Sequence, residues 1–156
     1  MITDKTARKK TFSKILVAIH ESSKSADKAV DYATRIAKDY DAILVVLYVV
    51  RTHTNLDTET VPSHVIDFKK QAQAYLSKIL EKIHKKQGQT DNIVKVKSEI
   101  IASNKIPNAI VNYAKDKHID LIVVGPRGQS KLKSLVLGSV TSDVVRLANC
   151  PVLTVR

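Results

Sequence analysis

Three of the four glycines in this 156-residue chain lie in one segment, GPRGQSKLKSLVLGS at positions 125–139. Glycine is favoured where the backbone needs a positive φ angle, or where another group must approach the backbone closely. A single turn would need one glycine, whereas this segment contains Gly125, Gly128 and Gly138. The clustering therefore suggests that the segment binds a ligand.

Phosphate is the ligand chemistry that these residue types favour. The spacing Gly125-x2-Gly128-x9-Gly138-Ser139 is neither a Walker A loop nor the G-x-G-x-x-G of dinucleotide-binding folds. If Gly138 and Ser139 open a helix, its free N–H groups and positive dipole end would attract a phosphate. Arg127 could neutralise phosphate charge. The alternative, which the sequence leaves open, is that Gly125 and Gly128 form a turn while Gly138 allows close packing.

Five strand-like runs must position this segment. They lie at residues 14–19, 42–50, 92–100, 120–125 and 151–156. The first, second and fourth runs are nearly continuous in Val, Ile and Leu, which is typical of strands buried on both faces of a parallel sheet. The third run alternates Val94 and Val96 with lysines, as expected for a strand nearer an edge.

Four amphipathic patterns separate these runs and predict helices. Apolar residues recur at spacings of three and four within residues 26–37, 65–83, 110–114 and 140–148. The second stripe includes Phe68, and Pro107 suits the first turn of the third helix. The order βαβαβαβαβ predicts a doubly wound α/β sandwich, in which ligands bind beyond the carboxyl ends of the strands. Gly125 ends a strand and Gly138 opens the last helix, so the glycine segment falls at that position.

Three stretches of the chain resemble the universal stress protein family, and the likeness runs from about residue 13 to the C-terminus. The family's opening strand resembles KILVAI. Its third helix and fourth strand resemble IPNAIVNYAKDKHIDLIVVGPRG, and its C-terminal end resembles LGSVTSDVVRLANCPVLTVR. The spacing G-x2-G-x9-G-(S/T) is the motif of the family's ATP-binding branch, and this chain carries all of it.

The length of the chain predicts one domain, and residues 1–12 predict a flexible basic tail before it. The resemblance places the domain at residues 13–156. It implies a five-stranded parallel sheet with strand order 3-2-1-4-5 in a three-layer α/β/α sandwich, and a homodimer formed through the last strand. It also implies an adenine nucleotide, ATP first of all, held between the ends of the first and fourth strands. The main chain of Ala18, Ile19 and Val49 would line the adenosine. The ribose and phosphates would lie against Gly125, Arg127, Gly128, Gly138, Ser139, Val140 and Thr141.

His20 is a departure from the family pattern. It stands at the end of the first strand, where ATP-binding members usually carry Asp. A carboxylate can accept hydrogen bonds from sugar hydroxyls and support a metal ion, whereas imidazole does either poorly or differently. The resemblance therefore places His20 in the site and leaves both the identity of the nucleotide and its Mg²⁺ dependence open.

The sequence favours a binding module or switch over an enzyme, because no nucleophile–base pair and no arginine finger can be identified; we expect slow hydrolysis at most. The alternative that His20 motivates is a nucleotide-free dimer that binds an unknown protein partner. The four histidines at positions 53, 64, 84 and 118 lack metal-ligand spacing, so we expect no metal site from them. Asp27 and Asp31 lie among basic residues and predict a solvated helix face, while Cys150 before a proline predicts a buried thiol.

The net charge of +11 would attract polyanions. The lysines are scattered, however, and aromatic residues, on which single-stranded bases stack, make up only 4% of the chain. We therefore expect no nucleic-acid partner, with nucleic-acid binding through the basic tail as a second alternative.

No apolar run reaches the roughly 18 residues of a membrane span. The polar start does not read as a secretory signal, and Cys150 has no intrachain partner, so we expect a cytoplasmic protein.

Overall fold

The computed structural model describes residues 11–20, 24–53, 63–88, 93–125 and 137–156. Arg127 and Gly128 of the predicted site lie outside these residues, as do residues 1–10 of the predicted tail. None of the helices in the described ranges is long and apolar enough to cross a membrane.

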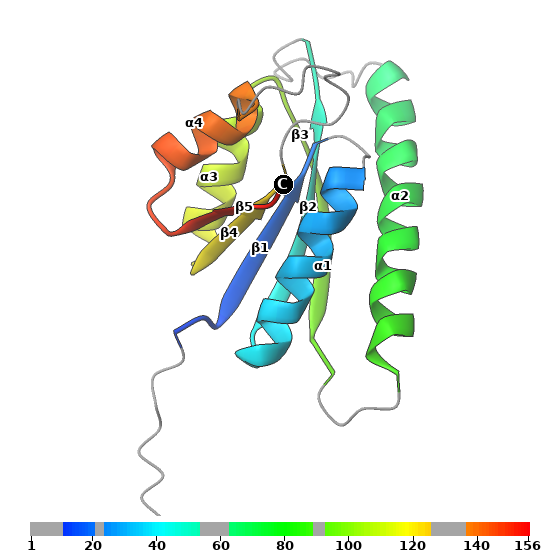
Figure 1. The fold of residues 1–156 in the computed structure, drawn as a ribbon. Coiled ribbons are helices and arrows are strands. Elements are labelled where there is room, and N and C mark those ends of the chain that lie inside the picture. The colour runs from blue at the N-terminus through cyan, green and yellow to red at the C-terminus, as the bar shows by residue number, and fades with distance from the viewer. Residues whose placement is uncertain (1–10, 21–23, 54–62, 89–92, 126–136) are drawn as a thin grey trace, which may run out of the picture.

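Five parallel strands form one sheet in the order β3-β2-β1-β4-β5 (Figure 1). Their bounds are β1 Lys14–Ile19, β2 Ile43–Arg51, β3 Val96–Ser103, β4 Leu121–Val124 and β5 Val152–Thr154. The central strand β1 pairs with β2 on one side and with β4 on the other, so the chain reverses its direction of winding between β1 and β4. The predicted α/β fold and strand order are confirmed.

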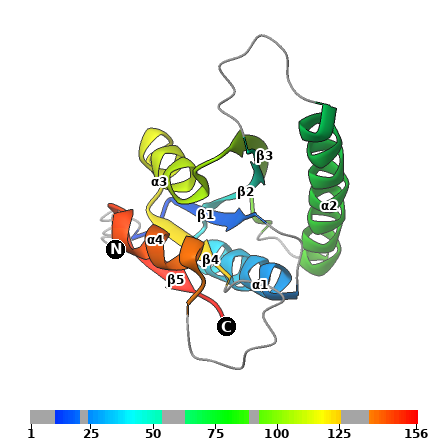
Figure 2. The same cartoon turned by 90° about the horizontal axis from the view of Figure 1, so that it is seen from above.

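Four helices cover the two faces of the sheet, and Figure 2 shows them as separate layers. They are α1 Lys24–Asp39, α2 Ser63–Gln87, α3 Ile106–Asp116 and α4 Ser139–Leu147. Helices α1 and α2 pack on one face, and α3 and α4 pack on the other. The result is the three-layer α/β/α sandwich that the sequence predicts.

Strand β1 shows why its run is apolar throughout. Ile15, Val17 and Ile19 point into the core beneath α1 and α2, whereas Leu16 and Ala18 point into the core beneath α3 and α4. All five side chains are buried. Because side chains alternate between the two faces of a strand, a central strand between two helix layers has no solvent-facing position for a polar residue.

Strand β3 begins and ends later than the sequence predicts. Its pairing with β2 starts at Leu44 with Val96 and continues to Arg51 with Ser103. The predicted start at residue 92 is wrong, and Ile93 is 62% exposed. The strand continues past Ile100 because β2 is long enough to pair with three more residues.

One surface prediction is wrong and another is incomplete. Phe68 belongs to the apolar stripe of α2, yet its ring is 43% exposed and lies edge-on to His64, one turn earlier on the same helix. The face of α1 that carries Asp27 and Asp31 is exposed to solvent, with these side chains 37% and 44% exposed, and it also pairs with α2. Asp27 accepts a hydrogen bond of 2.8 Å from the Tyr75 hydroxyl. These carboxylates also form ion pairs with Lys82 and Lys86 of α2.

Candidate functional site

The carboxyl ends of β1, β2 and β4 bring together residues that are far apart in the sequence. Ala18 pairs with Val124, and Ile19 pairs with Tyr48. The next residues along these strands are Gly125, His20 and Val49, which therefore meet at one edge of the sheet. This edge lies where the winding reverses, the position at which doubly wound folds bind ligands.

The strand residues predicted to line an adenosine have their side chains in the core. Ala18 and Val49 are buried beneath the α3 and α4 layer, and Ile19 is buried beneath α1 and α2. A ligand at this edge could therefore meet only their main-chain N–H and C=O groups. His20 is half-buried at the end of β1.

Gly125 is required by the packing of α1 against β4. A Cβ atom at this position would lie 2.9 Å from the carbonyl oxygen of Ser25 and 3.1 Å from its carbonyl carbon. Both are backbone atoms in the first turn of α1, so neither can move aside as a flexible side chain could. The sequence offered a ligand or a turn as the reason for Gly125 and close packing only for Gly138, whereas the structure supplies a packing contact at Gly125 itself.

Thr141 joins α4 to the end of β4. Its hydroxyl donates a hydrogen bond of 3.0 Å to the carbonyl oxygen of Gly125, and the residue is 2% exposed. The bond sets the first turn of α4 directly beside the carboxyl end of β4. Because the hydroxyl is buried and its proton is used, a ligand here would meet the amide N–H of Thr141 and not its side chain.

The amino end of α4 has the features of an anion-binding site. Gly138 is the N-cap residue, with φ −59° and ψ 155°, and its carbonyl oxygen accepts the first intrahelical bond from the Ser142 N–H at 2.9 Å. The N–H groups of Ser139, Val140 and Thr141 precede that bond and have no acceptor within the helix. Glycine at the N-cap provides no side chain to occupy them. Such N–H groups and the helix dipole stabilise a bound phosphate.

The described residues offer no set of protein ligands for a metal ion. No three His, Cys, Asp or Glu side chains in the described ranges converge on one point. The structure describes these predicted site residues: Ala18, Ile19, His20, Val49, Gly125, Gly138, Ser139, Val140 and Thr141. Sequence reasoning missed Ser25, whose contribution is a backbone carbonyl and which therefore leaves no residue-type signal.

Comparison with known proteins matches this geometry to a family. The sequence profile of the universal stress protein family matches residues 11–156. The chain belongs to this family. Among its relatives, the universal stress protein YxiE of Bacillus subtilis is 41% identical over 152 residues, which cover 93% of this chain and 99% of that protein.

Solved structures of other members share the fold of this universal stress protein. UspA from Lactobacillus plantarum is 30% identical with a TM-score of 0.68, over 93% of this chain and 98% of that one. A universal stress protein solved in complex with cAMP is 25% identical with a TM-score of 0.70, over 94% of this chain and 98% of that one.

Proposed function

We propose that this universal stress protein binds an adenine nucleotide, ATP first of all, between the carboxyl ends of β1 and β4. The phosphates would lie on the N–H groups of Ser139, Val140 and Thr141. The observation that carries the proposal is the hydrogen bond from Thr141 to Gly125, which sets an uncapped helix end beside the strand edge. The nucleotide complex of a related protein of this family supports the same ligand class.

The proposed activity is binding without efficient catalysis. The described site presents main-chain N–H groups, which can hold phosphate, and buried aliphatic side chains, which carry no acid or base. His20 is the one titratable side chain among the described site residues. Because His20 replaces the carboxylate, nucleotide binding is to be measured both without and with Mg²⁺. Such a protein would act as a nucleotide-dependent switch in the stress response.

We further propose a cytoplasmic location, because the single cysteine cannot form the intrachain disulfides that are common in oxidising compartments.

Isothermal titration calorimetry with ATP, ADP, AMP and cyclic AMP tests the proposal. We expect at least one nucleotide to bind with a dissociation constant of about 1 μM, on the order of 8 kcal/mol of binding free energy. No binding heat from any of the four at protein concentrations well above that value would overturn it. Co-purification of an adenine nucleotide, identified by mass spectrometry, would support it independently.

The variant Gly138→Asp separates the site from the fold. Aspartate is a good N-cap residue, so it would satisfy the free N–H groups of α4 while placing a negative charge where the phosphate should lie. The φ angle of −59° is accessible to any residue. We expect nucleotide binding to be lost with the free energy of unfolding unchanged or increased. Gln71→Glu is the control, because it adds the same negative charge at an exposed position of α2, outside the site. Equal binding by the two variants would contradict the proposal.

A further inference from the structure

A second hollow lies at the opposite end of the sheet, against the amino ends of β1, β2 and β3. Its volume is about 500 Å³, and α3 forms one of its walls. Ile43 and Val45 of β2 form an apolar floor, and the rim carries lysines from three separate elements: Lys14, Lys97 and Lys117. Neither the glycine segment nor α4 contributes to it.

The positions of these lysines follow from the strand register and from the packing of α3, which covers β2 but leaves β3 exposed. Lys14 pairs with Ile43, and Val45 pairs with Lys97, which places the two lysines on either side of the apolar floor. Helix α3 packs on β2, so the edge strand β3 keeps Lys97 and Glu99 exposed on this face. The hollow is therefore the part of the sheet face that lies between α3 and the edge strand.

The rim is held in place by contacts among its own residues. The Lys14 ammonium donates a hydrogen bond of 3.0 Å to the carbonyl oxygen of Lys117, at the end of α3. The Tyr113 hydroxyl donates a bond of 2.6 Å to Oε2 of Glu99. The Lys117 ammonium lies 5.8 Å from the centre of the Tyr113 ring. These contacts tie α3 to β1 and β3, so the polar groups are positioned before any ligand arrives.

The rim carries more positive than negative charge. Among the described residues, no carboxylate lies within ion-pair distance of the ammonium groups of Lys14, Lys97 or Lys117. Glu99 is the one carboxylate of the rim, and one of its oxygens already accepts from Tyr113. Burial, followed by the hydrogen bond to Glu99, raises the pKa of Tyr113 well above its ordinary value. The phenol therefore stays neutral and protonated at physiological pH.

We propose that this hollow binds a small organic anion with an apolar body. Its acidic group would lie between Lys97 and Lys117, with Lys14 adding to the positive field, and its body would lie over Ile43 and Val45. Three lysines and a single carboxylate around an apolar floor favour an amphipathic anion over a neutral ligand or a bare inorganic ion. The chain's own residues 1–10 are a poor occupant, because they carry four basic residues against one acidic residue.

Paired fluorescent probes test the site in the full-length protein. 1-Anilinonaphthalene-8-sulfonate has an aromatic body with a sulfonate, and N-phenyl-1-naphthylamine has the same body without the charge. Both titrations are run with and without saturating ATP, so that binding at the nucleotide site can be subtracted. We expect the sulfonate probe to bind in both conditions and more tightly than the neutral probe. Affinity that vanishes with ATP, or equal affinity for the two probes, would overturn the proposal.

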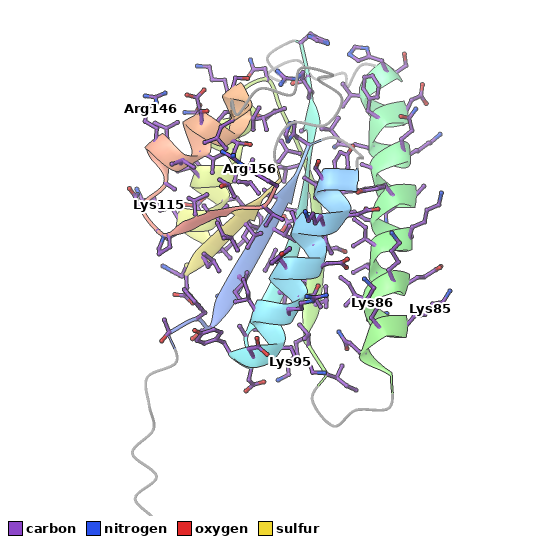
Figure 3. The ribbon with its side chains drawn as sticks, in the orientation of Figure 1. Lys85, Lys86, Lys95, Lys115, Arg146 and Arg156 are labelled. Atoms are coloured by element: carbon purple, nitrogen blue, oxygen red, sulfur yellow. The ribbon has the colours of Figure 1, made fainter. Side chains whose placement is uncertain are left out.

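The double variant Lys97→Ala/Lys117→Ala locates the binding. We expect about tenfold weaker binding of the sulfonate probe, because two charge contacts are lost. Lys85→Ala/Lys115→Ala is the matched control, since it makes the same charge change on α2 and α3 without touching the hollow (Figure 3). We expect its affinity to stay within about twofold of the wild type. Equal losses in the two double variants would overturn the proposal.

Amide NMR of the wild-type protein provides a readout that does not depend on variants. Added sulfonate probe should shift the amide resonances of Lys97, Tyr113 and Lys117 while leaving those of Gly138 and Ser139 in place. Shifts confined to α4 would show that the probe uses the nucleotide site, and would overturn the second site. The proposal does not rest on nucleotide binding, so either can fail while the other stands.

Discussion

At the scale of single residues, Gly125 shows that a glycine in a ligand-binding motif can also be required by the fold. Its missing side chain leaves room for the carbonyl group of Ser25 in the first turn of α1. Its own carbonyl oxygen accepts the hydroxyl proton of Thr141. The residue thus contacts both helix layers from the end of one strand. Its φ angle is not in the left-handed region, so its use is spatial and not conformational.

The substitution Gly125→Ala should destabilise the protein before any nucleotide is added. A Cβ atom 2.9 Å from a backbone oxygen forces α1 and β4 apart. Overpacking of this kind costs about 1–3 kcal/mol of unfolding free energy. Urea denaturation of the nucleotide-free protein measures this loss. If the variant kept its stability and lost only nucleotide affinity, the glycine would serve ligand approach and the packing argument would be wrong.

The role of Gly125 could not be predicted from the sequence. The glycine cluster indicated that something comes close to the backbone, but the two explanations, a ligand or a neighbouring element, have the same residue-type signature. What decides between them is the backbone of Ser25, a hundred positions earlier. Every residue has the same main-chain carbonyl group, so the contact leaves no trace in the sequence of α1.

At the scale of secondary-structure elements, most of the fold could be predicted because the strands are strongly patterned. The apolar runs of β1, β2 and β4 are buried between two helix layers, and that burial is what makes their sequences continuous. The wrong predictions concern residues at the surface of the molecule. The bounds of the edge strand β3 depend on how far β2 extends beside it. The exposure of Phe68 depends on the position of α2 over the sheet, which periodicity alone does not specify.

The attachment of α4 to β4 is expected to depend on Thr141. In Thr141→Val the shape is kept but the hydrogen bond to Gly125 is lost, at a cost of about 0.5–1.5 kcal/mol of unfolding free energy. Because the bond positions the amino end of α4, nucleotide affinity should fall as well. Calorimetry and denaturant unfolding measure the two effects. Ser142→Ala is the control, since that hydroxyl is exposed and makes only a 3.4 Å contact to Leu137. Unchanged nucleotide affinity in Thr141→Val would contradict the role given to this bond.

At the scale of the whole molecule, the large positive charge is spread over the surface. The basic residues labelled in Figure 3 come from α2, α3, α4, the residue before β3 and the C-terminus. Surface ion pairs compensate some of the charge, as with Lys82 and Asp27 between α2 and α1. The lysines around the hollow beside α3 have no such partner among the described residues. Anion recognition is therefore expected at particular hollows of the molecule, not along one basic stripe.

The two edge strands of the sheet, β3 and β5, differ in how readily they would pair with a strand of a second molecule. Strand β3 is an eight-residue edge flanked by exposed charged side chains, which discourage pairing with another strand. Strand β5 is short, with half-buried side chains at Val152 and Leu153, and the neighbouring Val145 of α4 is 46% exposed. An apolar strand edge beside an exposed apolar side chain favours self-association about a two-fold axis. We therefore propose a homodimer formed through β5.

The hydrogen-bond pattern of β5 provides a sharp test of that dimer. Pro151 accepts from the Ile122 N–H, and the Val155 N–H donates to Val124. These residues face β4, so the alternate residues Val152 and Thr154 direct their N–H groups to the free edge. Thr154→Pro removes one outward donor and leaves the pairing with β4 intact, in the kind of edge position where proline is tolerated. Thr154→Ala keeps the donor and controls for loss of the side chain.

Light scattering should give a wild-type mass of twice the 17.3 kDa chain at micromolar concentration. Thr154→Ala should remain a dimer, because its main-chain donor is still present. Thr154→Pro should shift toward the monomer mass, because each subunit loses one outward donor and so one strand-to-strand bond is lost on each side of the two-fold axis. Its far-ultraviolet circular dichroism should match the wild type, since the sheet within each subunit keeps its bonds. A monomeric wild type would overturn the dimer, and a fully dimeric Thr154→Pro would place the interface away from β5.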